Sequence, residues 1–254
     1  MFSCRKIEMS TKKHCTLILL SGGQGKRMGT DKAKQYLELG GKPVIEYSLE
    51  AVERSEVIDD CILVVRPEDR TYVRETILAG NRFEKVRAIA DGGRERSESV
   101  WNGLKLIHEL FGGCEQGNGF PDVIYIHDGA RPFLDEKMIR DCYDDAIKYR
   151  ACVIGYPSRD TVKVVDAEGI VVDTPDRRAL SAVQTPQGFL TDLVKTALTK
   201  AVSEGKEYTD DCAAVEALGA PTYLCEGSSE NIKITKPMDI SLAELIIRQR
   251  EAKA

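Results

Sequence analysis

The sequence contains no continuous apolar stretch near the roughly 18 residues that a membrane-spanning helix needs, so we expect no membrane association. Residues 1–14 are polar and basic, and they lack the apolar middle region of a secretion signal. We therefore expect a disordered or ragged N-terminal segment, in which Met9 could be the true start. The same lack of a signal leads us to expect a cytoplasmic protein.

No two cysteines stand in a C-x-x-C arrangement, although the chain has eight of them. Several lie in apolar runs such as residues 61–65, so reduced thiols are a simpler interpretation than a disulfide framework. An excess of positive charge is also missing, since 36 Lys and Arg face 41 Asp and Glu for a net charge of -5. We therefore expect no nucleic acid polymer as a partner, and only local phosphate binding.

Neither an internal repeat nor a low-complexity tract interrupts the chain, and short β-branched runs alternate with amphipathic stretches. This pattern predicts a single α/β domain over residues 15–254, a Rossmann-like, mostly parallel sheet with helices on both faces. The predicted strands are 16–20, 61–65, 86–90, 123–126, 152–156, 223–226 and 232–234. Helices are expected after Pro43 and Ser97, near 190–202 and 210–218, and from Pro237 onward. Ligands of such sheets bind beyond the carboxyl ends of the strands.

One segment, at about 158–178, departs from this alternation. Residues 161–165 and 170–174 form two short β-branched runs around the polar turn 166–169, which is typical of a β-hairpin. A hairpin alone is only marginally stable. We expect it to act as a dimerisation arm that reaches another subunit, and packing on its own domain is the alternative.

The first predicted strand leads directly into a glycine-rich loop that begins at Ser21. Gly22, Gly23 and Gly25 allow a tight curl that turns several backbone N–H groups toward one anion. The spacing fits neither a P-loop nor G-x-G-x-x-G, so an ATPase loop and a dinucleotide fold are not supported. Four cations follow within a dozen residues and would repel one another without a polyanion between them: Lys26, Arg27, Lys32 and Lys34. A triphosphate is the expected ligand, and a plain glycine turn with solvated charges is the alternative.

Three further groups are expected near the same sheet edge. In the first, Gly93 follows a predicted strand and permits close backbone approach to a nucleotide base, although Ser97 could simply cap a helix there. In the second, Asp128 suits a Mg²⁺ ligand and Arg131 suits a phosphate, with an ion pair between them as the alternative. His127 beside them is read as a packed, hydrogen-bonded side chain. In the third, Lys233 lies between two β-branched residues, and a solvated lysine is its simplest interpretation.

Taken together, these segments resemble the 2-C-methyl-D-erythritol 4-phosphate cytidylyltransferases of the non-mevalonate isoprenoid pathway, whose sheet is of the nucleotide-diphospho-sugar transferase type. The resemblance runs from about residue 16 to about residue 248. It rests on ordered motifs: Lys26-Arg27-Met28, Lys34-Gln35-Tyr36, Asp91-Gly92-Gly93 with Arg96 and Ser99, His127-Asp128-Gly129-Ala130-Arg131-Pro132, Arg159-Asp160-Thr161, Asp176-Arg177, Gln184-Thr185-Pro186-Gln187, Thr209-Asp210, and Asn231-Ile232-Lys233-Ile234-Thr235.

The resemblance implies transfer of CMP from CTP to a sugar-alcohol phosphate with release of pyrophosphate, by a homodimer that uses Mg²⁺. It places the catalytic cations Arg27, Lys34 and Lys233 on the CTP phosphates and makes Asp128 the Mg²⁺ ligand. The nucleotide pocket would be built from the loop residues Ser21, Gly22, Gly23 and Gly25, together with Gly93 and Ser99. The acceptor phosphate would be held by Arg131 and Thr161, with Arg177 and Thr185 donated by the arm of a partner subunit.

Five positions differ from the usual family pattern. Ser21-Gly22 stand in place of alanines, Ala33 in place of a proline, Arg94 in place of an acidic residue and Gly129 in place of an alanine. A ribitol 5-phosphate cytidylyltransferase is the nearest alternative function, because it shares the chemistry and nearly the same motifs. A non-catalytic nucleotide-binding or scaffolding protein is the alternative from another class.

Overall fold

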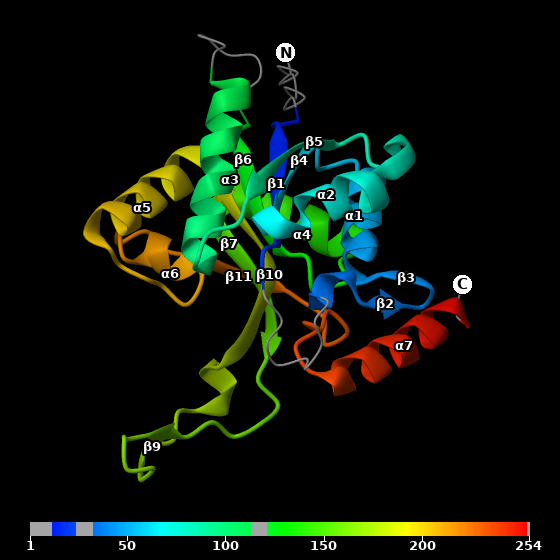
Figure 1. Ribbon diagram of the computed structural model, residues 1–254. Coiled ribbons are helices and arrows are strands. Elements are labelled where there is room, and N and C mark those ends of the chain that lie inside the picture. Colours follow the sequence, from blue (N-terminus) through cyan, green and yellow to red (C-terminus); the bar gives the residue numbers. More distant parts are fainter. Residues whose placement is uncertain (1–11, 24–32, 113–120, 253–254) are drawn as a thin grey trace, which may run out of the picture.

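The computed structural model describes residues 12–23, 33–112 and 121–252. These residues form a seven-stranded sheet in the order β11-β7-β10-β6-β1-β4-β5, with helices on both faces (Figure 1). Its strands are β1 (Cys15–Ser21), β4 (Asp60–Val65), β5 (Val86–Asp91), β6 (Val123–Asp128), β7 (Ala151–Pro157), β10 (Ser181–Leu190) and β11 (Tyr223–Glu226). The helices are α1 (Val44–Arg54), α2 (Arg70–Tyr72), α3 (Arg96–Phe111), α4 (Glu136–Tyr149), α5 (Thr191–Glu204), α6 (Asp211–Glu216) and α7 (Pro237–Glu251). A short 3-10 turn, η2 (Lys34–Tyr36), precedes the small hairpin of β2 (Glu38–Leu39) and β3 (Lys42–Pro43).

The mostly parallel α/β sheet predicted from the sequence is confirmed. β1 pairs in parallel with both β4 and β6, β4 with β5, and β7 with β11. β10 is the exception, because it runs antiparallel between β6 and β7. Because β10 contains polar residues and Pro186, its sequence does not show the apolar pattern of a strand. Its hydrogen-bond ladder with β7 is irregular between Val183 and Gln187.

Alternating strand residues build two separate cores, one on each face of the sheet. Leu17 and Leu19 of β1 pack with residues of α1 and α4. Ile18 faces the other way and packs with residues of α3, α5 and α6. Both faces of the central strands are therefore covered, which explains their nearly continuous apolar runs. A third, smaller cluster joins α7 to β2 through Leu39 and Ile234.

Three local predictions differ from the structure. Residues 232–234 do not form a strand, and the N–H of Ile234 instead donates to the carbonyl of Ala130 at 2.8 Å. Ser97 lies inside the first turn of α3 rather than capping it, because the N-cap position belongs to Glu95. Pro43 is the N-cap of α1, one residue before the predicted first turn, since it also pairs with β2.

The predicted hairpin is present as β8 (Val164–Val165) paired antiparallel with β9 (Val171–Asp173). Figure 1 shows this segment extending away from the sheet, below the ends of β7 and β10. Its apolar side chains are exposed: Val162, Val164, Val165, Ile170, Val171 and Val172. The core of its own chain therefore does not bury this apolar surface.

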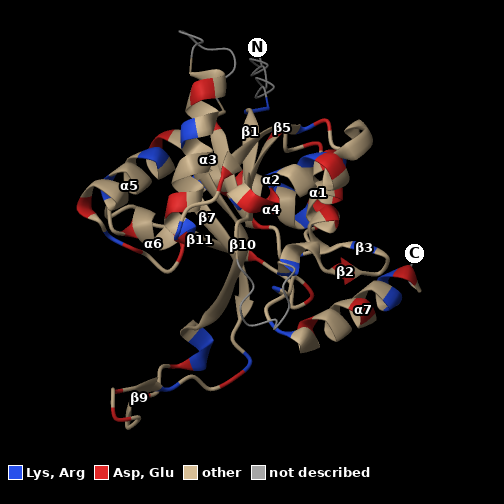
Figure 2. Ribbon diagram, in the orientation of Figure 1, with Lys and Arg blue, Asp and Glu red and all other residues tan. Residues whose placement is uncertain are grey.

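The outer helices carry charge of both signs, and Figure 2 shows Lys and Arg interspersed with Asp and Glu along them. In the part of the chain that the structure describes, no helix is both long enough and apolar enough to span a bilayer. Six cysteines fall within the described ranges, and all six are buried free thiols.

Candidate active site

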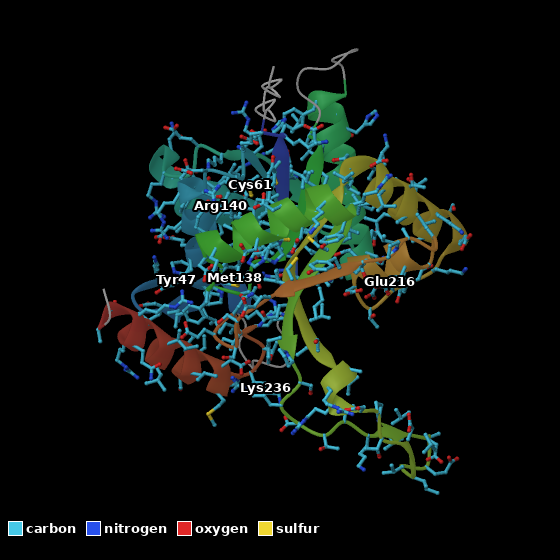
Figure 3. The ribbon with its side chains drawn as sticks, turned by 180° about the vertical axis from the view of Figure 1, so that it is seen from behind. Tyr47, Cys61, Met138, Arg140, Glu216 and Lys236 are labelled. Atoms are coloured by element: carbon cyan, nitrogen blue, oxygen red, sulfur yellow. The ribbon has the colours of Figure 1, made fainter. Side chains whose placement is uncertain are left out.

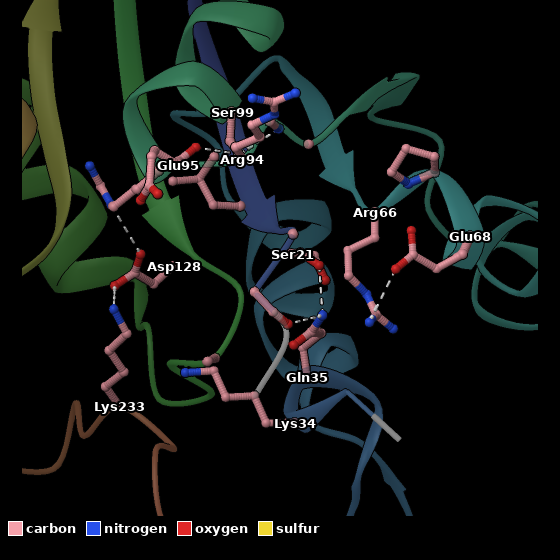
Figure 4. Close-up of a pocket in the computed structure, with 18 of the residues that line it drawn as sticks. Ser21, Lys34, Gln35, Arg66, Glu68, Arg94, Glu95, Ser99, Asp128 and Lys233 are labelled. Carbon is pink, nitrogen blue, oxygen red and sulfur yellow. Dashed lines mark hydrogen bonds and ion pairs between the residues drawn. The ribbon is translucent and has the colours of Figure 1, made fainter. Parts of the chain in front are cut away.

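A cavity of about 690 Å³ opens at the carboxyl edge of the parallel strands β1, β5 and β6 (Figure 4). This volume lies within the usual range for small-molecule sites, about 300–1,000 Å³. Residues from six separate parts of the sequence line it: Leu20, Ser21, Gly22, Gly23, Lys34, Gln35, Arg66, Pro67, Glu68, Gly92, Gly93, Arg94, Glu95, Arg96, Ser99, Asp128, Ala130, Lys233 and Thr235. The structure thus brings together most of the candidate site residues on one edge of the sheet, as strand topology predicts.

The first wall of the cavity is the loop after β1, held from beneath by Gln35. The Gln35 side-chain amide donates to the carbonyl of Ser21 at 2.6 Å and more weakly to that of Gly23 at 3.4 Å. Gln35 is buried in η2 next to Lys34, so the contact that holds Ser21 and Gly23 also positions the backbone of the lysine. In Figure 4 the Lys34 side chain extends from this turn toward Asp128 and Lys233.

The second wall is the turn between β5 and α3, and glycines let it approach the first wall closely. A Cβ on Gly22 would lie 3.6 Å from the Cα of Gly92, and one on Gly92 would lie 3.4 Å from the Cα of Gly22. The Ser99 hydroxyl accepts from the N–H of Gly93 at 3.0 Å and donates to the carbonyl of Glu95 at 3.1 Å. Ser99 therefore fixes this turn against the first wall, and both turns present backbone groups to the cavity.

Asp128 ends β6 and is surrounded by three cations. Its carboxylate contacts Lys233 Nζ at 2.8 Å, Arg131 Nε at 3.6 Å and Arg96 Nε at 3.7 Å. Burial alone would raise the pKa of Asp128, but Lys233, Arg96 and Arg131 outweigh it and hold that pKa well below its usual range. The carboxylate is therefore ionised at neutral pH, while the local balance of charge stays positive.

Asp211 is a residue of this cluster that the sequence analysis missed. It is 2% exposed, and its carboxylate pairs with Arg96 Nη1 at 2.7 Å. Its N–H donates to the side-chain oxygen of Gln187 in β10. Arg96 thus bridges two buried carboxylates and is oriented toward the cavity. The signals in the sequence were Arg96 in its motif and the Thr209-Asp210 motif directly before Asp211, but nothing local connects residues 96 and 211.

Lys233 is aimed by an extended segment rather than by a strand. The Asn231 side chain donates to the carbonyl of Thr185 at 3.0 Å, and the Asn231 carbonyl accepts from Arg131 and from Gln184. The Ile234 side chain is buried in the third apolar cluster. The Lys233 side chain is partly exposed, but its Nζ is paired with Asp128 at 2.8 Å, so its interpretation as a simply solvated lysine is wrong.

His127 and Thr185 lie behind Asp128, out of the cavity. Thr185 accepts from the N–H of Asp128 at 3.0 Å and bonds His127 Nδ1 at 2.9 Å, while His127 Nε2 lies 3.3 Å from the Arg131 carbonyl. Burial lowers the pKa of His127 to about 4, so the ring is neutral at pH 7. The packed, hydrogen-bonded role predicted for His127 is confirmed. The prediction that Thr185 lies on the arm is wrong. Thr185 lies in β10 and is buried in the sheet of its own chain.

The remaining candidates fall into three groups. Thr161 and Arg177 lie on the exposed arm segment, where Arg177 donates to the carbonyl of Arg159, and neither lines the cavity. Arg131 lies beside the cavity, and its Nε finds no hydrogen-bond partner among the described residues. Arg27 and Gly25 lie outside the described residues.

The structure also accounts for some of the positions that differ from the usual family pattern. Arg94 lines the cavity, and its N–H donates to Glu98 Oε2 at 2.7 Å, so an acidic residue still stands at that edge. At Gly129 a Cβ would lie only 3.0 Å from the carbonyl oxygen of Leu20, so the missing methyl group relieves a close contact. Ala33 is buried before η2 with an extended backbone.

Comparisons with known proteins agree on one family. The family model described as "IspD: 2-C-methyl-D-erythritol 4-phosphate cytidylyltransferase" matches residues 15–249. A protein of that name from Lachnospira eligens is 42% identical over 236 residues, which cover 92% of this chain and 99% of the relative. One from Clostridium perfringens is 42% identical over 232 residues, covering 91% and 97%.

Solved structures agree as well. The crystal structure of 4-diphosphocytidyl-2C-methyl-D-erythritol synthase from Anaerococcus prevotii has a TM-score of 0.79 at 29% identity, covering 93% of this chain and 97% of the other. A further structure of a synthase of that name has a TM-score of 0.75 at 30% identity, covering 94% and 100%.

The charge cluster predicts how the stability of the protein depends on pH. Asp128→Asn should lower the free energy of unfolding by about 2–4 kcal/mol at pH 7, because Lys233 and Arg131 lose a buried counter-charge. The pKa of Asp128 is lower in the folded than in the unfolded chain. Its stabilisation is therefore fully present above the unfolded pKa and is lost as the pH falls through the folded pKa.

The difference in the free energy of unfolding between wild type and Asp128→Asn should consequently stay constant down to about pH 5 and shrink below about pH 4, as measured by urea denaturation. Glu168→Gln, on the exposed turn of the arm, is the control and should show no such trend. If this difference in unfolding free energy is unchanged at about pH 3, the cations do not stabilise the charged form of Asp128.

Proposed function

The chain belongs to the 2-C-methyl-D-erythritol 4-phosphate cytidylyltransferase family, and on this premise we propose that it transfers CMP from CTP to 2-C-methyl-D-erythritol 4-phosphate. The products are 4-diphosphocytidyl-2-C-methyl-D-erythritol, an intermediate of isoprenoid precursor biosynthesis, and pyrophosphate. The observation that carries this proposal is the meeting of Lys34, Lys233 and Arg96 around Asp128 in one nucleotide-sized cavity.

CTP lies with its base against the two glycine turns and its phosphates over the cations. Backbone groups of these turns, held by the Ser99–Gly93 hydrogen bond, read the edge of a small pyrimidine ring. Lys34 and Lys233 neutralise the triphosphate, and Arg27 joins them from the loop after β1. Binding of the phosphates requires little reorganisation of the protein, because Gln35 already holds the backbone beside Lys34 and Asn231 holds the backbone beside Lys233.

Mg²⁺ is the proposed metal, and the residues present fit it. A hard cation of this kind is usually held by one or two carboxylates together with substrate phosphates. Asp128 offers one ionised carboxylate at the cavity wall. The bound ion would neutralise charge on the phosphate oxygens, and Asp128 would hold it.

The acceptor phosphate lies on the Arg131 side of Asp128. Arg131 is largely buried and pairs with Asp128 through Nε at 3.6 Å, and a guanidinium so placed suits a phosphate oxygen of the acceptor. We place Thr161 and Arg177 of a partner subunit at the same phosphate, because both lie on an arm whose apolar side chains are exposed. The proposed assembly is a homodimer joined through this arm, and the proposed location is the cytoplasm.

The chemistry is an in-line displacement at the α-phosphorus of CTP. An oxygen of the acceptor phosphate forms the new P–O bond, and the bond between the α-phosphorus and the bridging oxygen of the β-phosphate breaks, so pyrophosphate leaves with that electron pair. A phosphate dianion is already nucleophilic and needs no general base. This agrees with the neutral, fully buried His127, which faces away from the cavity and is hydrogen-bonded on both nitrogens. The enzyme acts by orientation and charge neutralisation.

Loss of the Lys34 charge tests the phosphate-binding role. Lys34→Ala should lower kcat by at least about 100-fold, because a cation is removed from the charge that develops in the transition state. Release of pyrophosphate from CTP measures turnover, and circular dichroism checks the fold. Lys137→Ala, an exposed lysine on α4, is the matched control. Near-normal turnover of Lys34→Ala would remove this residue from the site.

The identity of the acceptor is tested by direct competition. With CTP and Mg²⁺, 2-C-methyl-D-erythritol 4-phosphate should give a kcat/KM at least about tenfold above that of ribitol 5-phosphate, because the pocket must match one carbon skeleton. The reverse order would identify the ribitol enzyme instead. Binding of CTP without turnover of either acceptor would indicate a non-catalytic protein.

The arm predicts complementation between two defective subunits. If Arg177 serves the site of the partner, a heterodimer of Arg177→Ala and Lys34→Ala chains has one intact site and should show about half of the wild-type activity. Each homodimer should be nearly inactive. Two affinity tags isolate the heterodimer for the pyrophosphate assay. If the heterodimer is as inactive as its parents, the arm does not act across the interface.

A further inference from the structure

Three cysteines far apart in the sequence converge on the face of the sheet that α4 covers. Cys142 comes from α4, Cys152 from β7 and Cys225 from β11, and their sulfur atoms all lie within 4.8 Å of one another. The sulfurs of Cys142 and Cys152 are 3.4 Å apart. Figure 3, which views the molecule from behind, shows α4 lying across this end of the sheet beside β11.

The strand register makes this meeting a property of the fold. β7 and β11 pair in parallel with Tyr223 opposite Cys152 and Cys225 opposite Ile154. Cys152 and Cys225 are therefore on the same face, on neighbouring strands, and α4 places Cys142 above them. The cysteines are 0%, 0% and 3% exposed in chain order, so the cluster is nearly closed and Cys225 lies nearest to solvent.

A glycine of β10 leaves room for the sulfurs. Gly188 pairs with Cys152, and a Cβ at position 188 would lie 2.9 Å from Cys142 Sγ and 3.2 Å from Cys152 Sγ. Any side chain there would press on both sulfur atoms. The space beside the sulfur pair is thus kept free by the absence of one methyl group.

A carboxylate lies next to this cluster. Asp145 is one helical turn after Cys142 on α4 and is only partly buried. Burial and a hydrogen bond with Cys225 raise the pKa of its carboxyl group to about 6. The carboxyl group of Asp145 therefore lies beside Cys225, the cysteine of the three that is nearest to solvent.

We propose that Cys142, Cys152 and Cys225 bind one thiophilic divalent cation of the Zn²⁺ class, and that the carboxylate of Asp145 moves from Cys225 to this ion as its fourth ligand. Tetrahedral Zn²⁺ takes sulfur at about 2.3 Å, which places bound sulfurs roughly 3.8 Å apart. The cluster reaches this spacing with sulfur movements of about 1 Å or less. Each thiol loses its proton to solvent on binding, as thiolate ligands require.

This site is chemically distinct from the cavity at the carboxyl edge. Thiolates select soft or borderline ions, whereas the oxygen ligands of Asp128 and of phosphates select hard ions. The consequence of binding is structural. β11 is the outermost strand and pairs in the sheet only with β7, so the ion would fasten this edge strand to α4.

The test uses the intact chain, freed of metal by a chelator and kept reduced under nitrogen. Titration with Co²⁺ should give a thiolate-to-cobalt charge-transfer band and the visible bands of a tetrahedral ion, saturating at one Co²⁺ per chain. Zn²⁺ should displace the Co²⁺ and raise Tm by several degrees, because it binds the folded chain.

Variants separate the cluster from the other cysteines. Cys142→Ser and Cys225→Ser should lose the charge-transfer band and the Zn²⁺-dependent rise in Tm. Cys61→Ser, a buried cysteine in β4 outside the cluster, is the matched control and should keep both. Asp145→Asn should keep the band and weaken Zn²⁺ binding by about tenfold or more; unchanged affinity would remove this carboxylate from the site.

The absence of a charge-transfer band in the wild type, or its survival in both cluster variants, would overturn the proposal and leave three thiols packed as apolar core. Zn²⁺ X-ray absorption on the wild type covers the case in which the variants do not fold. A shell of three sulfurs at about 2.3 Å supports the site. A shell of oxygen and nitrogen alone overturns it.

Discussion

The site depends on one buried carboxylate that the fold must keep charged. Asp128 ends a central strand, where an isolated negative charge would be costly to bury. Lys233, Arg96 and Arg131 remove that cost, and they come from the segment before α7, the start of α3 and the turn after β6. Pairing Asp128 therefore forces three distant parts of the chain to meet at one sheet edge, and this meeting defines the cavity.

The same pairing leaves positive charge in excess where a polyanion belongs. Arg96 is shared between Asp128 and Asp211, while Lys34 adds a further cation from η2. Because the chain as a whole carries a net charge of -5, the attraction acts only over a short range, and salt screens it beyond about 10 Å. Selectivity for a small phosphorylated ligand follows from this contrast between local and global charge.

Much of this arrangement could be predicted from the sequence, because it depends on residues that are close together in the chain. Apolar runs such as residues 61–65 and 123–126 are continuous because helices cover both faces of their strands. Glycines at positions 22, 92 and 93 follow strand ends, and a Cβ on Gly22 or Gly92 would contact the Cα of the other. β10 could not be predicted in the same way, because its polar residues face neighbours that are distant in sequence. Thr185 was misplaced for that reason.

What the sequence by itself determined was the parallel sheet, the glycine turns at its carboxyl edge, the hairpin arm and the cations of the site. Periodicity and backbone sterics act over a few residues, so a linear reading captures them. Only the tertiary structure decided that Asp211 holds Arg96, that Thr185 supports Asp128, and that Cys142, Cys152 and Cys225 meet. These contacts depend on strand order and on which face each residue takes. The antiparallel strand β10, set between β6 and β7, decides that order through long-range pairing.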